Sequence, residues 1–505
     1  MKHADIAMIG LGVMGRSLAL NLVEHGFQVT GYDISDAHRQ RASDEAKALS
    51  SPDGALLVAS DLKQLITALS TPRVIALSVP AGEIVDNVID DLLAAGLEPQ
   101  DIVIDTGNSL WRDSEAREAR YDGQCHFFST AVSGGEVGAR HGPSLMASGN
   151  PEAWQRIQPM WTAIAAKVDN QGQPVGSFDD GEPCAAYLGP AGAGHYVKMV
   201  HNGIEYADMQ LICEAYHFMS SALALSAREV GEIFTRWNQG VLNSYLLEIS
   251  ADILQTQDPV TGAAFVDIVL DKAEQKGTGL WTAVNALQSG IPAPTIAQAV
   301  FSRAQSSQKS LRLQAACHFD DKYFDDNHFD ERTPALKAHE RDAALSDLHD
   351  ALYCAKLVAY AQGFDLMSAT SKEQGWDLDF AAIAKIWRAG CIIRAGFLHS
   401  IRQAFDADPT LAHLLLAPTF SAQLKRYHQG FRHTIARTAQ LGVPMPAMSS
   451  ALHYFDGLRT PILPANLLQA QRDYFGSHTY SRTDEDERRK FHLNWSDVPR
   501  TQSNA

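Results

Sequence analysis

The stretch Ile6-Ala7-Met8-Ile9-Gly10-Leu11-Gly12-Val13-Met14-Gly15 decides the fold of the N-terminal half. A short apolar strand is predicted over residues 6–9, and apolar residues then recur at helical spacing until Gly26. Between the two, residues 10–15 fit G-x-G-x-x-G, in which the glycines permit a tight turn, close approach of a pyrophosphate and close packing of the helix. The helix N-terminus adds N–H donors for a phosphate. The pattern predicts a dinucleotide held by Gly10, Leu11, Gly12, Val13, Met14 and Gly15, although a tight turn that binds nothing is the alternative.

Asp33 indicates which dinucleotide is preferred. It closes a second predicted strand, residues 28–32, and a carboxylate there accepts hydrogen bonds from the ribose hydroxyls of NAD but repels the 2′-phosphate of NADP. Ile34 follows, so no arginine stands directly beside the site. Arg39 and Arg41 lie close enough to screen a phosphate, or they belong to a solvated helix face. The sequence therefore predicts NAD over NADP.

The architecture follows from strands that alternate with helical stretches. Further strands are predicted at residues 74–79, 102–105 and 126–132, an order typical of a doubly wound parallel sheet that binds ligands beyond its carboxyl ends. After residue 195 the strand signal fades into apolar helical stretches. We expect a Rossmann-like α/β domain, a large all-α domain and a C-terminal tail that is charged and poor in helix, over residues 1–187, 188–450 and 451–505. The segments 169–190 and 319–342 are expected to be exposed loops.

Composition narrows the class of protein. The formal net charge of −17 argues against binding to nucleic acid or to anionic membranes. Six scattered cysteines without metal-ligand spacing favour a reducing compartment, without disulfides and without a zinc site. No stretch approaches the length of a membrane span, and no secretory leader is evident. A cytoplasmic protein that uses no metal is expected.

A second constellation lies in residues 192–206. Lys198, His201, Asn202 and Glu205 are spaced i, i+3, i+4 and i+7, which places all four on one face of a helix. This face would carry a base candidate, an acid candidate and two hydrogen-bonding groups. A solvated stripe with a Lys/Glu pair fits the spacing equally well.

The chain resembles the family of decarboxylating 6-phosphogluconate dehydrogenases. The similarity covers residues 192–206 and recurs in order along the chain, at residues 105–109, 132–140, 142–146, 275–279, 386–394 and 463–476. The resemblance implies that Lys198 is the general base for the C3 hydroxyl and that Glu205 protonates C1 of the enediol, giving ribulose 5-phosphate and carbon dioxide. These roles require a lowered lysine pKa and a raised carboxyl pKa.

The resemblance also assigns binding residues and an assembly. Cofactor contacts fall on the glycine turn and on Asp33, Ile34, Ser35, Val79 and Asn108, the last of which bridges cofactor and substrate. Substrate contacts fall on Ser133, Gly134, Gly135, His201 and Asn202, and phosphate contacts on Tyr206, Lys276, Thr278 and Arg303. Arg472 and His478 match residues that the tail of one subunit delivers to the site of the other, which implies a homodimer with exchanged tails.

The chain departs from the family pattern at the cofactor and at the phosphate. Most members carry Asn-Arg-Thr where this chain has Asp33-Ile34-Ser35, which supports the prediction of NAD. Leu280 replaces a lysine found in many relatives. Two alternatives are a shorter β-hydroxyacid dehydrogenase, which lacks the long second half, and a non-enzymatic dinucleotide sensor, which would tolerate loss of Lys198 or Glu205.

Overall fold

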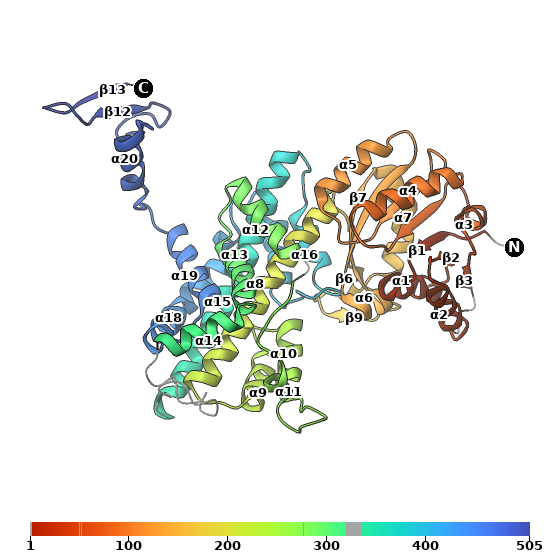
Figure 1. The fold of residues 1–505 in the computed structure, drawn as a ribbon, viewed down its shortest axis with the longest axis horizontal. Coiled ribbons are helices and arrows are strands. Elements are labelled where there is room, and N and C mark those ends of the chain that lie inside the picture. The colour runs from red at the N-terminus through yellow and green to blue at the C-terminus, as the bar shows by residue number, and fades with distance from the viewer. Residues whose placement is uncertain are drawn as a thin grey trace. The chain divides into compact units, whose positions relative to one another are not determined.

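An eight-stranded sheet organises the N-terminal part of the chain (Figure 1). The computed structural model describes residues 3–49, 51, 53–275, 277–319, 336 and 338–504. The strand order is β11-β7-β6-β5-β4-β1-β2-β3. The strands are β1 Ile6–Ile9, β2 Gln28–Tyr32, β3 Ala55–Val58, β4 Val74–Leu77, β5 Ile102–Asp105, β6 His126–Ser133, β7 Ser144–Gly149 and β11 Ala185–Tyr187.

Helices cover both faces of this sheet, because alternate strand residues point to opposite sides. Ile6 and Met8 of β1 pack with apolar residues of α1 and α7, whereas Ala7 and Ile9 pack with α3, α4 and α5. The predicted doubly wound Rossmann-like domain is thereby confirmed. Its helices are α1 Val13–Glu24, α2 Asp36–Lys47, α3 Leu62–Ala68, α4 Glu83–Ala95, α5 Trp111–Tyr121, α6 Gly135–His141 and α7 Pro151–Ile164.

The strands predicted from the sequence form a parallel sheet, but two edge strands that were not predicted run in the opposite direction. The strands from β6 to β3 run parallel, but β7 is antiparallel to β6, and β11 follows the direction of β7. The connection from β6 to β7, residues 134–143, is shorter than the dozen or so residues that a parallel crossover requires. The chain therefore turns back along the edge of the sheet.

The helix α8, Ala193–Ala222, leads from the sheet into the helical part. It packs against β6 and β7 and then against α12, α13 and α15. A Cβ at Gly194 would lie 2.4 Å from the carbonyl oxygen of Met146, so only glycine lets α8 approach β7 this closely. The other helices are α9 Ala227–Trp237, α10 Tyr245–Gln255, α11 Phe265–Ile268, α12 Thr278–Ser289, α13 Pro294–Ser306, α14 Lys309–Phe319, α15 Ala338–Gln374, α16 Phe380–Ile386, α17 Leu398–Ala407, the 3-10 helix η2 Leu414–Leu416, α18 Pro418–Leu441 and α19 Pro446–Leu458. This confirms the predicted large helical domain.

The segment 169–190 was expected to be a loop and is partly strand. Its short strands β9 Pro174–Val175 and β10 Glu182–Pro183 flank β8 Lys167–Val168, and β11 extends the main sheet. Strands of two or three residues are too short to show an alternating pattern in sequence. Residues 320–335, the bulk of the second expected loop, lie outside the described residues.

The chain forms two compact units, Met1–Ala451 and Leu452–Ala505, and each is described by itself. The predicted boundaries near residues 187 and 450 stay predictions. The second unit is richer in structure than the expected tail, with α20 Ala465–Gly476 and a hairpin of β12 Phe491–Asn494 and β13 Thr501–Asn504. The buried carboxylate of Asp473 accepts hydrogen bonds from the rings of His492 and Trp495. This unit packs around the polar carboxylate of Asp473, so its sequence shows no periodic pattern of apolar residues from which the structure could be predicted.

A search of the described helices for one long and apolar enough to cross a membrane finds none.

Replacing Gly12 and replacing Gly15, two of the three glycines of the turn, should have different effects. A Cβ at Gly15 would lie 1.9 Å from the carbonyl oxygen of Gly10, so Gly15→Ala should lower the free energy of unfolding by about 1–3 kcal/mol. A Cβ at Gly12 meets nothing within 4 Å, so Gly12→Ala should keep its stability and lose dinucleotide affinity. Denaturant unfolding and cofactor titration of both variants measure this. Equal stability of the two variants would contradict the packing argument.

Candidate active site

The glycine turn lies where β1 ends and α1 begins. Gly10 has a φ of +90°, and a Cβ there would lie 2.3 Å from the carbonyl oxygen of Ser78 and 3.3 Å from Val79. Gly12 is the N-cap of α1 and faces open space. The turn is therefore pressed against the loop after β4, and its outer side is free to receive a pyrophosphate. This fits the dinucleotide that the sequence predicts.

Asp33 braces this turn from the end of β2. Its nearly buried carboxylate accepts hydrogen bonds from Leu11 N at 2.7 Å and Ser35 N at 2.8 Å. The ring of His38 lies 3.2 Å away. Ile34 is 91% exposed and brings no charge to the ribose position. The carboxylate is thus held where the ribose 2′-hydroxyl of a bound dinucleotide is expected.

The nearby arginines already have partners. The guanidinium of Arg39 donates to the carbonyl oxygen of Asp33 and to the carboxylate of Asp36. Arg41 pairs with Glu45 at 2.7 Å. Both guanidinium groups are thus engaged with acceptors other than the carboxylate of Asp33, which stays available to a ligand.

Asn108 lies at the exposed tip of the loop after β5. The loop is held by Asp105, whose fully buried carboxylate accepts hydrogen bonds from Gly107 N at 2.9 Å and from the Ser109 hydroxyl at 2.6 Å. Sequence reasoning gave Asp105 no role, although it begins the motif 105–109. A buried acid at the end of a strand was the available signal.

Four predicted residues converge where α8 passes the last residue of β6. Lys198 Nζ donates to the Ser133 hydroxyl at 2.9 Å and lies 3.4 Å from His201 Nδ1. His201 Nε2 lies 3.3 Å from the same hydroxyl, and Asn202 Oδ1 lies 3.1 Å from His201 Nδ1. Glu205 continues the face, 4.0 Å from His201. The solvated stripe is thereby excluded, because Lys198 and His201 are buried.

The glycine loop beside this cluster is shaped by close packing. Gly134 has a φ of +110°, and a Cβ there would lie 2.6 Å from the carbonyl oxygen of Gly390. A Cβ at Gly135 would meet nothing within 4 Å. Gly134 therefore fixes the turn, and Gly135 leaves room next to Ser133.

Burial shifts the pKa values of Lys198 and Glu205, at the two ends of this helix face, in opposite directions. Desolvation lowers the pKa of Lys198, although the charge of Glu205 opposes it. Desolvation raises the pKa of Glu205, opposed by Lys198 and Arg303 and assisted by Asp208. The pKa of His201 falls well below its ordinary value because the ring is buried and next to Lys198. One face of α8 thus holds a group suited to taking a proton and another suited to giving one.

The predicted phosphate contacts adjoin Glu205. The guanidinium of Arg303 lies 3.4 Å from the ring centre of Tyr206, and it donates to the carbonyl oxygen of Glu274. Thr278 begins α12, and a Cβ at the next residue, Gly279, would lie 2.3 Å from the Tyr206 ring. The structure therefore brings Tyr206, Arg303 and the start of α12 together, with Leu280 exposed beside them. Lys276 lies outside the described residues.

Arg472 and His478 belong to the second unit. Arg472 is exposed on α20 and donates to the side chain of Gln469 at 3.2 Å. His478 follows the end of the same helix and is also exposed. Both are available to a ligand or to another subunit, and their proximity to Lys198 stays a prediction.

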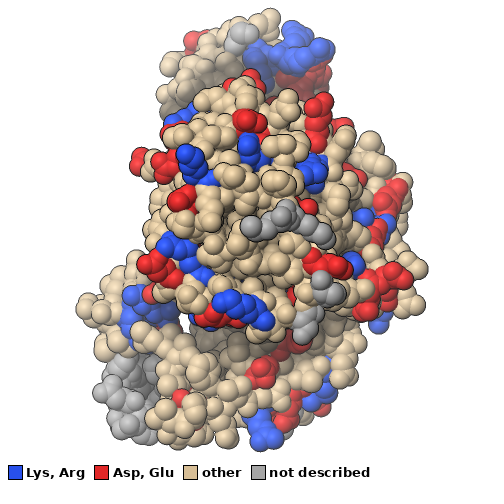
Figure 2. Space-filling model, turned by 90° about the vertical axis from the view of Figure 1, so that its right-hand side faces the viewer, with Lys and Arg blue, Asp and Glu red and all other residues tan. Residues whose placement is uncertain are grey.

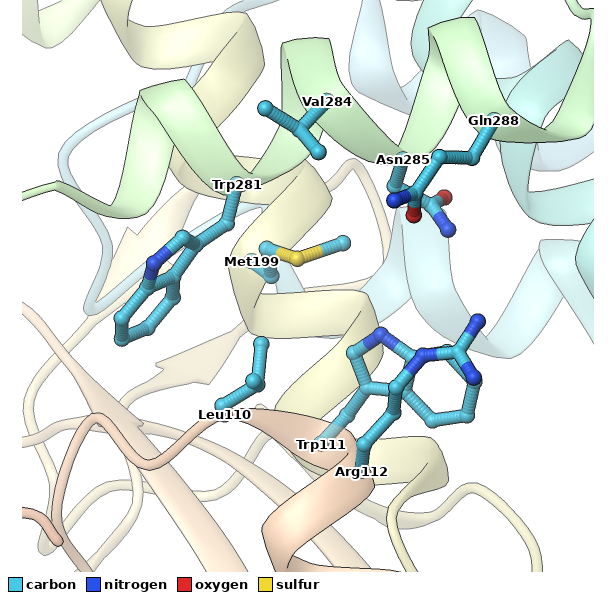
Figure 3. Close-up of a pocket in the computed structure, with 8 residues that line it drawn as sticks. All are labelled: Leu110, Trp111, Arg112, Met199, Trp281, Val284, Asn285 and Gln288. Carbon is cyan, nitrogen blue, oxygen red and sulfur yellow. The ribbon is translucent and has the colours of Figure 1, made fainter.

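A hollow of about 540 Å³ lies beside α8 (Figure 3). Its lining includes Met199, the neighbour of Lys198, and Leu110, which follows the loop of Asn108. The lining is completed by Trp111, Arg112, Trp281, Val284, Asn285 and Gln288.

The surface carries mixed charge. On the face drawn in Figure 2, Lys and Arg residues alternate with Asp and Glu, without a broad basic area among the described residues shown. The described residues also include no group of three His, Cys, Asp or Glu side chains placed to hold a metal ion. Two of the cationic groups predicted for the site differ in burial, because Lys198 is buried and Arg303 is partly exposed.

Known proteins resemble the chain over nearly its whole length. Family models described as the NAD binding domain and the C-terminal domain of 6-phosphogluconate dehydrogenase match residues 5–172 and 194–495. The decarboxylating 6-phosphogluconate dehydrogenase of Treponema pallidum is 46% identical over 98% of this chain and 97% of its own. The NADP(+)-dependent enzyme of Bacillus subtilis is 44% identical over 98% of this chain and 100% of its own. The solved 6-phosphogluconate dehydrogenase of Plasmodium falciparum matches with a TM-score of 0.88 and 38% identity, over 97% of this chain and 100% of that one.

Proposed function

The chain belongs to the family of decarboxylating 6-phosphogluconate dehydrogenases, and from this premise we propose how its residues convert 6-phosphogluconate to ribulose 5-phosphate and carbon dioxide, with NAD as the preferred oxidant. The observation that carries the proposal is the buried face of α8, where Lys198 and Glu205 have pKa values shifted toward each other. The full-length match also disfavours the shorter β-hydroxyacid dehydrogenase, which lacks the second half.

Lys198 begins the reaction as a neutral amine. Its Nζ accepts the proton of the C3 hydroxyl, and the Ser133 hydroxyl, 2.9 Å away, holds it in place. A bound nicotinamide ring supplies the acceptor for the hydride that leaves C3. The lysine is now an ammonium group next to the new carbonyl, which it polarises.

Decarboxylation and protonation follow on the same face. The bond between C1 and C2 breaks, carbon dioxide departs, and the electron pair moves to the C3 carbonyl oxygen, which takes the proton back from Lys198 to form an enediol. Glu205 then gives its proton to the former C2, which becomes C1 of ribulose 5-phosphate, while the C3 hydroxyl returns its proton to Lys198. His201 stays neutral, so with Asn202 it orients hydroxyl groups without competing for the transferred protons.

The substrate is held at its two ends. Ser133, Gly134 and Gly135 are proposed to hold the carboxylate, and Asn108 to bridge cofactor and substrate. Tyr206, Thr278, Arg303 and Lys276 hold the phosphate, for which the planar guanidinium of Arg303 is suited. Arg472 and His478 complete the phosphate site from the partner subunit of a homodimer.

NAD is proposed over NADP from the surroundings of Asp33. Its carboxylate is directed to the turn by the N–H groups of Leu11 and Ser35, and exposed Ile34 offers no positive charge. A 2′-phosphate would meet this negative charge, and the nearby Arg39 and Arg41 already pair with Asp36 and Glu45. A relative named as NADP(+)-dependent is 44% identical to this chain, so the preference depends on these local residues and not on the family.

Loss of the base or the acid should affect different steps. Lys198→Ala should lower kcat by about 10²–10⁴-fold, because proton transfer from the C3 hydroxyl loses its base. Glu205→Gln should slow exchange of the C1 hydrogens of ribulose 5-phosphate with heavy water by a similar factor. Stopped-flow absorbance and proton NMR measure the two steps, with exposed Lys63→Ala as the control. Near wild-type turnover of Lys198→Ala would refute the base assignment.

The cofactor preference is tested by kcat/KM for NAD and NADP under identical conditions. The wild type should favour NAD. Ile34→Arg should raise kcat/KM for NADP by at least an order of magnitude, since a bidentate guanidinium adds about 1.5–3 kcal/mol to binding of a charged group. Ile34→Gln is the matched control and should leave the NADP value low. A wild-type preference for NADP would overturn the proposal.

Tail exchange is tested by mixing two inactive subunits. Lys198→Ala and Arg472→Ala are each expected to be nearly inactive as homodimers. In a mixed dimer, the Arg472→Ala subunit keeps its Lys198 and receives an intact tail, so random assembly restores about a quarter of wild-type activity. Activity no greater than the sum of the two homodimers would show that each tail serves its own subunit.

A further inference from the structure

A buried ion pair joins α8 to α15 close to Glu205. Asp208 follows Glu205 by three residues, so the two side chains are neighbours on the helix surface. Asp208 Oδ1 lies 2.8 Å from Lys356 Nζ of α15, and Lys356 also donates to the Ser244 hydroxyl at 3.0 Å. Both charged side chains are fully buried. Sequence reasoning singled out none of these three residues.

Stability alone does not explain this pair. A buried ion pair is often no more stabilising than apolar residues of the same volume, because both charges lose their hydration. In the part of the chain that the structure describes, Asp208 Oδ2 has no hydrogen-bond partner, which adds a further cost. A negative charge kept at this expense next to the proposed acid points to a role in the reaction.

The groups around Glu205 show what that role is. Arg303 is a cation, and Lys198 becomes one when it takes the proton of the C3 hydroxyl; both then favour the carboxylate form of Glu205, whereas His201 is neutral. Tyr360 of α15 also faces this region, and its phenol donates to the carbonyl oxygen of Ile393 at 2.6 Å. Among these neighbours, Asp208 is the group whose charge favours the protonated acid. Without it, only burial would oppose the two cations.

We propose that Asp208 is a positioning residue whose negative charge, held by Lys356 and Ser244, keeps Glu205 in its acid form until it protonates the enediol. The inference rests on the proposed role of Glu205. In this proposal the buried carboxylate of Asp208 offsets the positive charges of Lys198 and Arg303, which act on Glu205 while they contact the substrate.

The test is the pH dependence of the protonation step. Removing the Asp208 charge lowers the pKa of Glu205, so the acid form is lost at lower pH. In Asp208→Asn, the alkaline limb of kcat and of C1 hydrogen exchange should move down by about one pH unit, which is a roughly tenfold loss above the limb. The acid limb, which reports Lys198, should stay in place, and Asp208→Glu should restore the wild-type profile.

A second variant shows whether a shifted pH profile results from the lost charge or from loss of folding. Asp208→Asn leaves Lys356 buried and unpaired, whereas Asp208→Asn/Lys356→Met replaces the pair by groups of similar volume and should remain folded. If the pair only supports the fold, the folded double variant will show the wild-type alkaline limb, and the inference is overturned. A limb that stays shifted in the double variant supports it.

Glu205→Gln separates failure of this inference from failure of the proposed function. If Glu205→Gln abolishes the alkaline limb and the Asp208 variants leave it unmoved, Glu205 is the acid and only the role of Asp208 is wrong. If Glu205→Gln keeps the limb, the acid assignment itself is wrong, and the inference falls with it.

Discussion

The rest of the site depends on the burial of Lys198 where α8 crosses the end of β6. An ammonium group is costly to bury, so this position favours the neutral amine and makes the lysine a usable base. The same crossing brings Ser133 within 2.9 Å and sets the direction of the helix face that carries His201, Asn202 and Glu205. Close approach of α8 to β7 is possible because Gly194 has no side chain.

Two proton-transfer groups on one face must avoid neutralising each other. A free Lys/Glu pair at this spacing would form an ion pair, with the amine protonated and the carboxyl ionised. Here both are largely removed from water, His201 lies between them in its neutral form, and a buried carboxylate follows Glu205. At the glycine turn the carboxylate of Asp33 instead accepts hydrogen bonds from two backbone N–H groups, which fix its position.

The sequence predicted what depends on local pattern. The turn at Gly10–Gly15, the flanking strand and helix, and the face from Lys198 to Glu205 follow from spacing, and the structure has them at those positions. The edge strands β7 and β11 and the unit built on Asp473 could not be foreseen, since they depend on a short connection and on polar contacts between distant residues. The same holds for Asp208 and Lys356, which are separated by most of the helical part and meet only in the fold.

In the proposed reaction one active site couples oxidation at C3 to loss of C1. This coupling is tested by following reduced nicotinamide absorbance and carbon dioxide release together, with purified protein, NAD and 6-phosphogluconate labelled with carbon-13 at C1. We expect labelled carbon dioxide and reduced cofactor in equal amounts throughout the reaction. Reduced cofactor without labelled carbon dioxide, or no turnover with either cofactor, would contradict it.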